Sequence, residues 1–443
     1  MSLDIPREEL TVHRERAFLV GVTLAGRPQV QEPLAELRGL TTAAGAVVVG
    51  TMHQHRVDIN PATYIGKGKL AELQQQVKCL DADVIIFDND LSPAQVRNLE
   101  KATNVKVIDR SELILDIFAT RARSVEARLQ VELAQLEYSL PRLRKMWTHL
   151  SRYRGGIGLR GPGETQLEED RRLVGQRIRD LRNRLSEVQA RKAREVNSRF
   201  EEHTVSLVGY TNAGKSTLMN ALTGAGVRAE DQLFSTLDTR TRQWHLKDWG
   251  KVLLSDTVGF IRDLPHHLVA SFRATLEETR QARLLLHVVD ASNPAAEEHI
   301  RAVNRVLEEL GCDEKRCILV LNKIDQLPDR SYLDVLQNHH PRAVAVSAAN
   351  KVGLDQLRAT VIEELSADFA EAEVETSSGN GRLLAYLAAH ADIHHRLYDD
   401  QRVRIRCSLP RHLLHHIQGP DVDVRFLDGD GCVRGEHTDV SKR

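Results

Sequence analysis

The feature that most constrains the fold of this chain is a glycine-rich loop that joins a short apolar run to an apolar helix pattern. The run covers residues 204–209 (TVSLVG), and the pattern G-x-x-x-x-G-K-[ST] follows with Gly209, Gly214, Lys215 and Ser216. In such a loop the glycines let backbone N–H groups turn toward phosphate oxygens, the lysine adds a positive charge, and the serine hydroxyl binds Mg²⁺. Strand, loop and helix in this order predict a P-loop domain of the α/β class.

Four further motifs follow the P-loop in the order that guanine-nucleotide binding requires. FSTLDT places Thr236 within reach of Mg²⁺ and the γ-phosphate, and DTVG places Asp256 near the magnesium shell and the N–H of Gly259 near the γ-phosphate. In NKID, the carboxylate of Asp325 accepts from the ring N–H and the amine of guanine, whereas adenine would present an acceptor to it. The SAA motif at 347–349 offers backbone N–H groups to the guanine oxygen. Together the motifs predict binding of GTP rather than ATP.

The sequence thus predicts one nucleotide site that contains a magnesium site. The residues expected to bind the nucleotide are Gly209, Tyr210, Thr211, Asn212, Ala213, Gly214, Lys215, Ser216, Thr217, Phe234, Ser235, Thr236, Leu237, Asp238, Asp256, Thr257, Val258, Gly259, Asn322, Lys323, Ile324, Asp325, Ser347, Ala348 and Ala349. Ser216 and Thr236 are the expected magnesium ligands, with Asp256 acting through a water molecule. We expect Lys215 and Thr236 to support the transition state. No catalytic base is predicted, because Phe260 occupies the position where many small GTPases carry a water-orienting glutamine.

A second glycine-rich stretch, RYRGGIGLRGPGET at residues 152–165, contains the G-x-G-x-x-G spacing of a dinucleotide-binding turn. A basic segment rather than a strand precedes it, and Glu164 after it would repel a phosphate. We instead predict a loop that contacts RNA, in which Arg152, Arg154 and Arg160 supply planar groups for phosphates and bases. A solvated turn between two helices is the alternative interpretation.

Apolar periodicity divides the chain into four pieces. Residues 1–112 alternate strand and helix patterns and predict a small α/β domain, whose YIGKGK loop reads as a turn rather than an anion site. Residues 113–200 predict a long helical hairpin with the arginine-glycine loop at its tip, and residues 201–367 predict the P-loop domain with a parallel sheet. Residues 368–443 predict a small α+β domain that follows a linker with the sequence AEAEVETSSGNGR.

Composition limits the protein class. The 61 basic and 62 acidic side chains leave a net charge of −1, so any basic surface for a nucleic acid must be local. No apolar run approaches a membrane span, and five scattered cysteines without C-x-x-C spacing fit a reducing compartment, so we expect a cytosolic protein. A monomer is expected as well. The histidines of HLLHH (His412, His415 and His416) lack a carboxylate or thiol at a partnering interval and predict no metal site.

The motifs GYTNAGKSTL, FSTLDT, DTVGFIRDLPHHLVASF, NKID and VSAA, together with GGIGLRGPGETQLEEDRR, resemble those of the bacterial HflX GTPases. The resemblance implies a GTPase that binds the large ribosomal subunit through ribosomal RNA and proteins, is stimulated there, and dissociates ribosomes under stress. A hydrophobic residue at Phe260 is typical of this group and implies slow turnover that a partner accelerates. Asn212 resembles an asparagine that holds K⁺ in related GTPases, although an ordinary turn residue explains it equally well.

Two other functions remain open. The first is a nucleotide-gated regulatory or assembly module in which GTP turnover serves as a timer. A tRNA-modifying GTPase would use the same nucleotide motifs, but the C-terminal piece shows no cysteine-bearing motif for that chemistry.

Overall fold

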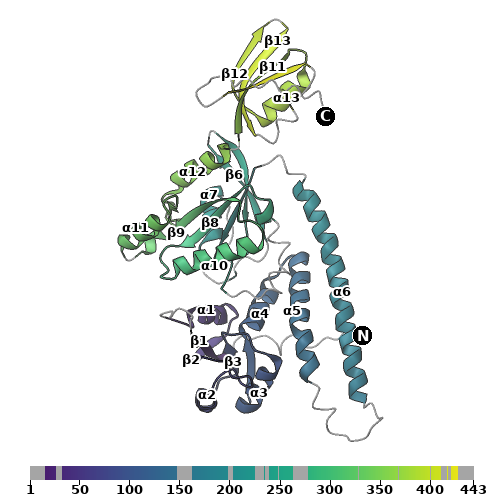
Figure 1. The fold of residues 1–443 in the computed structure, drawn as a ribbon, viewed down its shortest axis with the longest axis vertical. Helices are drawn as coiled ribbons and strands as arrows, with labels where there is room; N and C mark the ends of the chain where they lie inside the picture. Colours follow the sequence, from purple (N-terminus) through teal and green to yellow (C-terminus); the bar gives the residue numbers. More distant parts are fainter. Residues whose placement is uncertain are drawn as a thin grey trace.

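The computed structural model describes residues 15–25, 32–146, 162–197, 203–224, 234, 239–247, 249–262, 278–327, 329–367, 369–399, 401–410, 417 and 421–427. Figure 1 shows an elongated molecule in which the N-terminal α/β unit, the P-loop unit and the C-terminal sheet follow one another along the long axis. Two long helices run along one side. The predicted fold class, a P-loop GTPase unit between a small α/β unit with a helical hairpin and a small C-terminal unit, is confirmed.

The N-terminal unit is a four-stranded parallel sheet with helices on both faces. Its elements are β1 (Arg16–Leu24), α1 (Ala35–Ala43), β2 (Val47–Arg56), α2 (Lys67–Cys79), β3 (Val84–Phe87), α3 (Pro93–Thr103), β4 (Lys106–Asp109) and α4 (Arg110–Arg121), in sheet order β2-β1-β3-β4. Side chains alternate along β1, so Ala17 and Leu19 share a core with α1 and α4 while Phe18 and Val20 share one with α2. Burial of both faces explains why the central strands β1 and β3 are almost wholly apolar, whereas the edge strand β2 carries polar residues in its second half.

The helical hairpin consists of α5 (Val125–Met146) and α6 (Pro162–Asn197). Its seam is formed by the apolar positions that step by three and four residues in the sequence, namely Leu129, Leu133, Leu136 and Leu140 of α5 and Val174, Ile178, Leu181 and Leu185 of α6. The ion pairs Arg177–Glu132 and Arg182–Glu137, each at 2.7 Å, flank the seam. Because α6 begins at Pro162, the expected tip loop is shorter at its end than predicted, and Gly163 belongs to a helix.

The P-loop unit contains a six-stranded sheet. Its elements are β5 (His203–Gly209), α7 (Lys215–Thr223), β6 (Arg240–Leu246), β7 (Gly250–Asp256), β8 (Leu284–Asp290), α10 (Ala296–Glu309), β9 (Arg316–Asn322), α11 (Arg330–His339), β10 (Val344–Ala345) and α12 (Leu354–Ser366), in sheet order β10-β9-β8-β5-β7-β6. Five strands are parallel, as predicted, but β6 pairs antiparallel with β7 at the edge. Polar residues fill much of β6, which hid that strand from an apolar pattern search.

In the described residues of the C-terminal unit, an antiparallel sheet is covered by a helix. Its elements are β11 (Phe369–Ser377), α13 (Gly381–His390), β12 (Asp392–Asp399), β13 (Arg402–Pro410) and β14 (Val422–Leu427), in sheet order β12-β13-β11-β14. The prediction of a linker over AEAEVETSSGNGR is wrong, because its first half is the central strand β11. Ala372 and Val374 are fully buried, whereas Glu371 and Glu375 pair with arginines of β13. The acidic composition was mistaken for a linker although its period of two is that of a strand.

Candidate nucleotide-binding site

A cavity of about 470 Å³ opens where several strands of the P-loop unit end. Its wall combines the loop after β5, the segment after β7, the last residue of β8, and the loops that follow β9 and β10. The lining residues are Thr211, Asn212, Gly214, Lys215, Ser216, Thr217, Phe234, Thr257, Gly259, Asp290, Asn322, Lys323, Asp325, Gln326, Ala348 and Ala349. The carboxyl ends of parallel strands are where such sheets bind ligands, because the loops and helix N-termini converge there.

Two glycines of the P-loop are required by their surroundings. Gly209 has a φ of +152°, and a methyl group at this position would lie 2.2 Å from the carbonyl oxygen of Val288. Gly214 has a φ of +91°, and its methyl group would lie 2.3 Å from Nδ2 of Asn322. Any side chain at either position would therefore push the loop away from the neighbouring strands.

Lys215 is the buried cation of the cavity. It begins α7, and its Nζ donates to the carbonyl oxygens of Gly209 at 3.0 Å and Tyr210 at 2.8 Å. An ammonium carries three N–H donors, so these two bonds orient the group and leave one donor for a phosphate oxygen. Burial lowers the pKa of Lys215 to about 8, although the carboxylate of Asp256 acts in the opposite direction. A phosphate in the cavity would favour the charged form.

Ser216 and Asp256 form an oxygen-rich corner beside Lys215. The hydroxyl of Ser216 donates to the carboxylate of Asp256 at 2.6 Å, and both side chains are buried. Hydroxyl and carboxylate oxygens are the hard ligands that Mg²⁺ prefers, directly or through water. The adjacent Thr257 donates to the carbonyl of Leu207 at 2.7 Å, which fixes the chain as it leaves β7. The hydroxyl of Ser216 and the carboxylate of Asp256 are chemically suited to hold a magnesium ion, and their individual roles stay predictions.

Asn322 connects the two halves of the cavity. Its amide Nδ2 donates to the carbonyl of Ala213 in the P-loop at 2.9 Å, and its Oδ1 accepts from the N–H of Ala348 at 3.0 Å. The side chain is only 1% exposed. It therefore holds the loop predicted to bind phosphates and the loop predicted to bind guanine at a fixed separation.

The part of the cavity that was predicted to bind guanine is formed by the NKID segment and the SAA segment. Lys323 has a φ of +62° and pairs with Asp290 at 2.8 Å, and the exposed carboxylate of Asp325 lines the cavity in the short 3-10 turn that follows. Ala348 and Ala349 line the same cavity. An outward-facing carboxylate beside backbone groups is the arrangement that suits the donors of guanine.

Seven of the predicted residues that the structure describes do not line the cavity. They are Gly209, Tyr210, Ala213, Asp256, Val258, Ile324 and Ser347. Ser347 is buried, and its hydroxyl accepts from the N–H of Asn350 at 3.1 Å, so it shapes the loop instead of facing a base. Asp290 and Gln326 line the cavity and were missed. The position of Asp290 at the end of an apolar strand was the signal that could have found it.

Phe260 lies 4% exposed within an apolar cluster that includes residues of α4 and α10. Its backbone pairs with the P-loop, since its N–H donates to Gly209 at 3.1 Å and its carbonyl accepts from Thr211 at 2.7 Å. A buried phenyl ring cannot orient a water molecule. Phe234 also lines the cavity and packs edge to face on Phe118 of α4, with ring centroids 4.6 Å apart.

Several predicted residues lie outside the described part of the chain. They are Ser235, Thr236, Leu237 and Asp238, the loop arginines Arg152, Arg154 and Arg160, and the histidines His412, His415 and His416. Among the helices that the structure describes, none has the length and apolar character needed to cross a membrane.

Three known families match consecutive parts of the chain. They are described as GTP-binding GTPase N-terminal (residues 31–119), GTP-binding GTPase Middle Region (residues 121–199) and 50S ribosome-binding GTPase (residues 204–323). The GTPase HflX of Escherichia coli K12 is 48% identical over 372 residues, which cover 83% of this chain and 87% of the relative. The GTPase HflX of Caldanaerobacter subterraneus is 48% identical over 369 residues, 83% of this chain and 84% of the relative.

Solved structures of GTP-binding proteins are also similar to this chain. A GTP-binding protein from the archaeon Sulfolobus solfataricus in complex with GDP aligns with a TM-score of 0.43 and 23% identity, over 80% of this chain and 99% of the other.

Proposed function

Because the chain belongs to the HflX GTPase family, it hydrolyses GTP, and we propose that it does so as a factor that binds the large ribosomal subunit and dissociates ribosomes under stress. The match of residues 204–323 to a family described as 50S ribosome-binding GTPase supports the large ribosomal subunit as the binding partner. A cytoplasmic location would follow from that partner. We further propose the four-part division 1–112, 113–200, 201–367 and 368–443, with the protein acting as a monomer.

The main support for GTP binding at this site is the cavity itself. Lys215, Ser216 and the N-terminus of α7 form one end, which suits phosphates and Mg²⁺. Asp325 and the alanines of the SAA segment form the other end, which suits guanine. Asn322 fixes the distance between these ends through two hydrogen bonds. We propose that GTP occupies the cavity in this orientation, with Gly259 near the γ-phosphate.

The buried position of Phe260 supports a catalytic site that a partner completes. Its ring is 4% exposed and contributes to packing, so the chain position of the usual glutamine supplies no group that orients water. We propose that the large subunit fixes the attacking water or the switch segments, and that the free protein turns over slowly.

We propose K⁺ as a second cation beside the P-loop. Asn212 lines the cavity with an exposed side chain and has a φ of +61°, a conformation that asparagine tolerates in ordinary turns. A ligand role and a turn role are compatible. GTP turnover that is equal in K⁺ and Na⁺ would exclude the ligand role.

The helical hairpin supports the contact with ribosomal RNA. Both α5 and α6 extend along the N-terminal unit, and the ends that flank residues 147–161 point away from the C-terminal sheet (Figure 1). A rigid two-helix arm of this length can carry Arg152, Arg154 and Arg160 into a cleft while the GTPase unit stays at its entrance. We propose that the arm inserts into the large subunit and that the GTP-ordered switches control the insertion.

Co-sedimentation with purified large subunits tests this function. We expect binding with a nonhydrolysable GTP analogue and weaker binding with GDP, and we expect separation of intact ribosomes into subunits on sucrose gradients. Binding without separation would favour the nucleotide-gated assembly module. Absence of binding in every nucleotide state would refute the proposal.

A further inference from the structure

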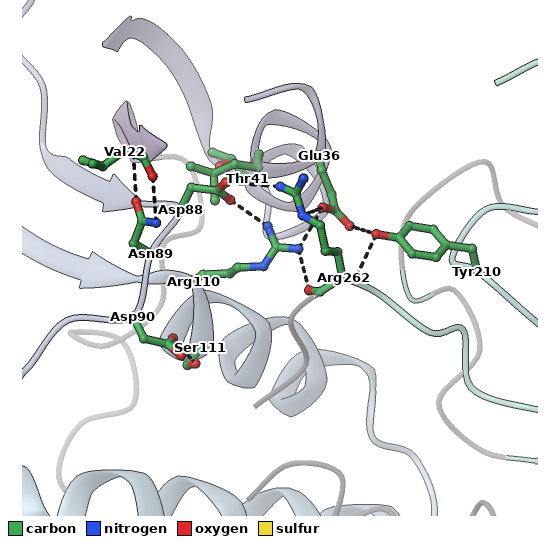
Figure 2. A network of polar contacts seen from close by, with 11 residues as sticks. Val22, Glu36, Thr41, Asp88, Asn89, Asp90, Arg110, Ser111, Tyr210 and Arg262 are labelled. Carbon is green, nitrogen blue, oxygen red and sulfur yellow. Dashed lines mark hydrogen bonds and ion pairs between the residues drawn. The ribbon is translucent and has the colours of Figure 1, made fainter. Parts of the chain in front are cut away.

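The N-terminal unit contacts the nucleotide site through a network of charged and polar side chains (Figure 2). Glu36 of α1, Asp88 after β3 and Arg110 of α4 come from the N-terminal unit. Tyr210 of the P-loop and Arg262, two residues after Phe260, come from the GTPase unit. The network therefore joins Glu36 to Tyr210, which lies 174 positions later in the chain. Tyr210 and Arg262 belong to the two segments that are predicted to surround the γ-phosphate.

Tyr210 is the central residue of the network. Its hydroxyl donates to the carboxylate of Glu36 and accepts from the backbone N–H of Arg262 at 2.7 Å. Its ring stacks on His299 of α10, with centroids 3.8 Å apart and planes at 8°. Burial and the nearby carboxylate of Glu36 raise the pKa of Tyr210, so the hydroxyl keeps its proton and remains a donor. One side chain thus fixes the P-loop, the segment after Gly259 and α1 relative to one another.

Two arginines balance two carboxylates around this tyrosine. Arg110 pairs with Glu36 at 2.9 Å and with Asp88 at 2.6 Å, and it also donates to the carbonyl of Arg262 at 3.1 Å. Arg262 lies 3.7 Å from Glu36 and 3.5 Å from Asp88. The side chain of Arg110 is 4% exposed and that of Asp88 is 13% exposed, so solvent screens these pairs weakly. Both the N–H and the carbonyl of Arg262 are held, which fixes the backbone and not only the side chain.

The position fixed in this way leaves little room beside Lys215. A methyl group built on Gly259 would lie 2.9 Å from the Cα of Thr211 and 3.1 Å from the Nζ of Lys215. A γ-phosphate that binds both the ammonium and the N–H of Gly259 must lie between these groups, and each of its hydrogen bonds spans about 2.7–3.2 Å. The segment that begins at Gly259 therefore lies directly against Thr211 and Lys215, on the side of the cavity where the γ-phosphate is proposed to bind.

We propose that Glu36, acting through Tyr210 and Arg262, is a positioning residue that holds the segment after Gly259 against the P-loop and thereby disfavours GTP relative to GDP. A ligand shifts an equilibrium between two arrangements only by its different affinity for each. We infer that a γ-phosphate inserted between Gly259 and Lys215 separates the two segments, so a network that holds them together weakens triphosphate binding more than diphosphate binding. The inference rests on the proposed roles of Lys215 and Gly259 at the γ-phosphate.

Tyr210→Phe in the full-length protein tests the inference, because it removes one hydroxyl and keeps the ring stacked on His299. Affinities for GDP and for a nonhydrolysable GTP analogue are measured by calorimetry on the nucleotide-free protein. We expect the ratio of analogue to GDP affinity to rise at least fivefold, the lower end of typical coupling between sites. Glu36→Gln should raise this affinity ratio by a similar factor. Because both variants break the same contact, the double variant should raise the ratio by less than the product of the two single increases.

Ser111→Ala is the matched control. Ser111 is buried in the same unit and donates to Asp90 at 2.5 Å, and this pair lies apart from Tyr210 in Figure 2. It should leave the ratio unchanged. Unchanged ratios in both Tyr210→Phe and Glu36→Gln, with Lys215→Ala losing affinity for the analogue, would overturn the inference alone. An unchanged affinity in Lys215→Ala would instead overturn the proposed nucleotide site.

Discussion

Asn322→Ala should separate the two halves of the nucleotide cavity and weaken nucleotide binding. The change leaves the carbonyl of Ala213 and the N–H of Ala348 without the side chain that now bonds them at 2.9 Å and 3.0 Å. A buried polar group left unpaired costs about 1–3 kcal/mol, so the two together cost about 2–6 kcal/mol. Part of this appears as a lower free energy of unfolding, because the bonds exist before a nucleotide binds. A water molecule that enters the vacated space can bond both groups, which brings the free-energy cost toward the lower end of this range.

The assay is calorimetric titration of GDP into the full-length variant, combined with thermal unfolding. A loss of about 2 kcal/mol corresponds to roughly thirtyfold weaker GDP binding. Asn380→Ala is the matched control, because Asn380 also accepts from a backbone N–H, that of Leu383 at 3.3 Å, but lies at the start of α13 in the C-terminal unit. It should lower stability without changing GDP affinity. GDP affinity within threefold of the unsubstituted protein in Asn322→Ala would refute the reasoning.

Three further predictions concern the base, the phosphates and the RNA contact. Asp325→Asn should weaken GDP binding at least tenfold and favour xanthine nucleotides, because it replaces an acceptor by a donor; titration with both nucleotides measures this, and a retained preference for guanine contradicts it. Burial lowers the pKa of Lys215 to about 8, and a phosphate requires its charged form, so GDP affinity should be full below that pH and fall by up to about tenfold per unit above it. A flat GDP titration from about pH 7 to pH 9.5 would exclude this role. Replacing Arg152, Arg154 and Arg160 together by alanine should weaken binding to large subunits and make it less sensitive to salt, with GTP affinity unchanged. Loss of GTP binding in that triple variant would assign the loop to the nucleotide site.

The sequence predicted the P-loop unit well because its signals are local. An apolar strand, a glycine pattern and a helix are adjacent, and the DTVG, NKID and SAA motifs each follow a parallel strand of the same sheet, which brings these three to one edge. The seam of the hairpin was equally visible, since its apolar residues repeat at helical spacing. The roles of individual residues in binding nucleotide stay predictions.

Features that depend on distant or polar residues were not visible. The strand β6 is an antiparallel edge with few apolar residues, and β11 was taken for a linker because glutamates occupy its exposed face. No local pattern links Glu36 to Tyr210 or Phe118 to Phe234, because these contacts arise only when the N-terminal unit packs against the GTPase unit. Tyr210 was predicted to bind nucleotide because it lies in the P-loop, and this role stays a prediction. The contacts of its hydroxyl with Glu36 of α1 and the N–H of Arg262 had no signal in the sequence.

The central claim is that this protein is a GTPase whose catalytic site is completed on the large ribosomal subunit. The most direct measurement is steady-state GTP turnover by the purified full-length protein, alone and with a saturating concentration of isolated large subunits. The buried ring of Phe260 predicts slow turnover alone and an increase of at least tenfold with large subunits, whereas small subunits should have no effect. Rapid turnover by the protein alone, or the same rate with and without large subunits, would contradict the account.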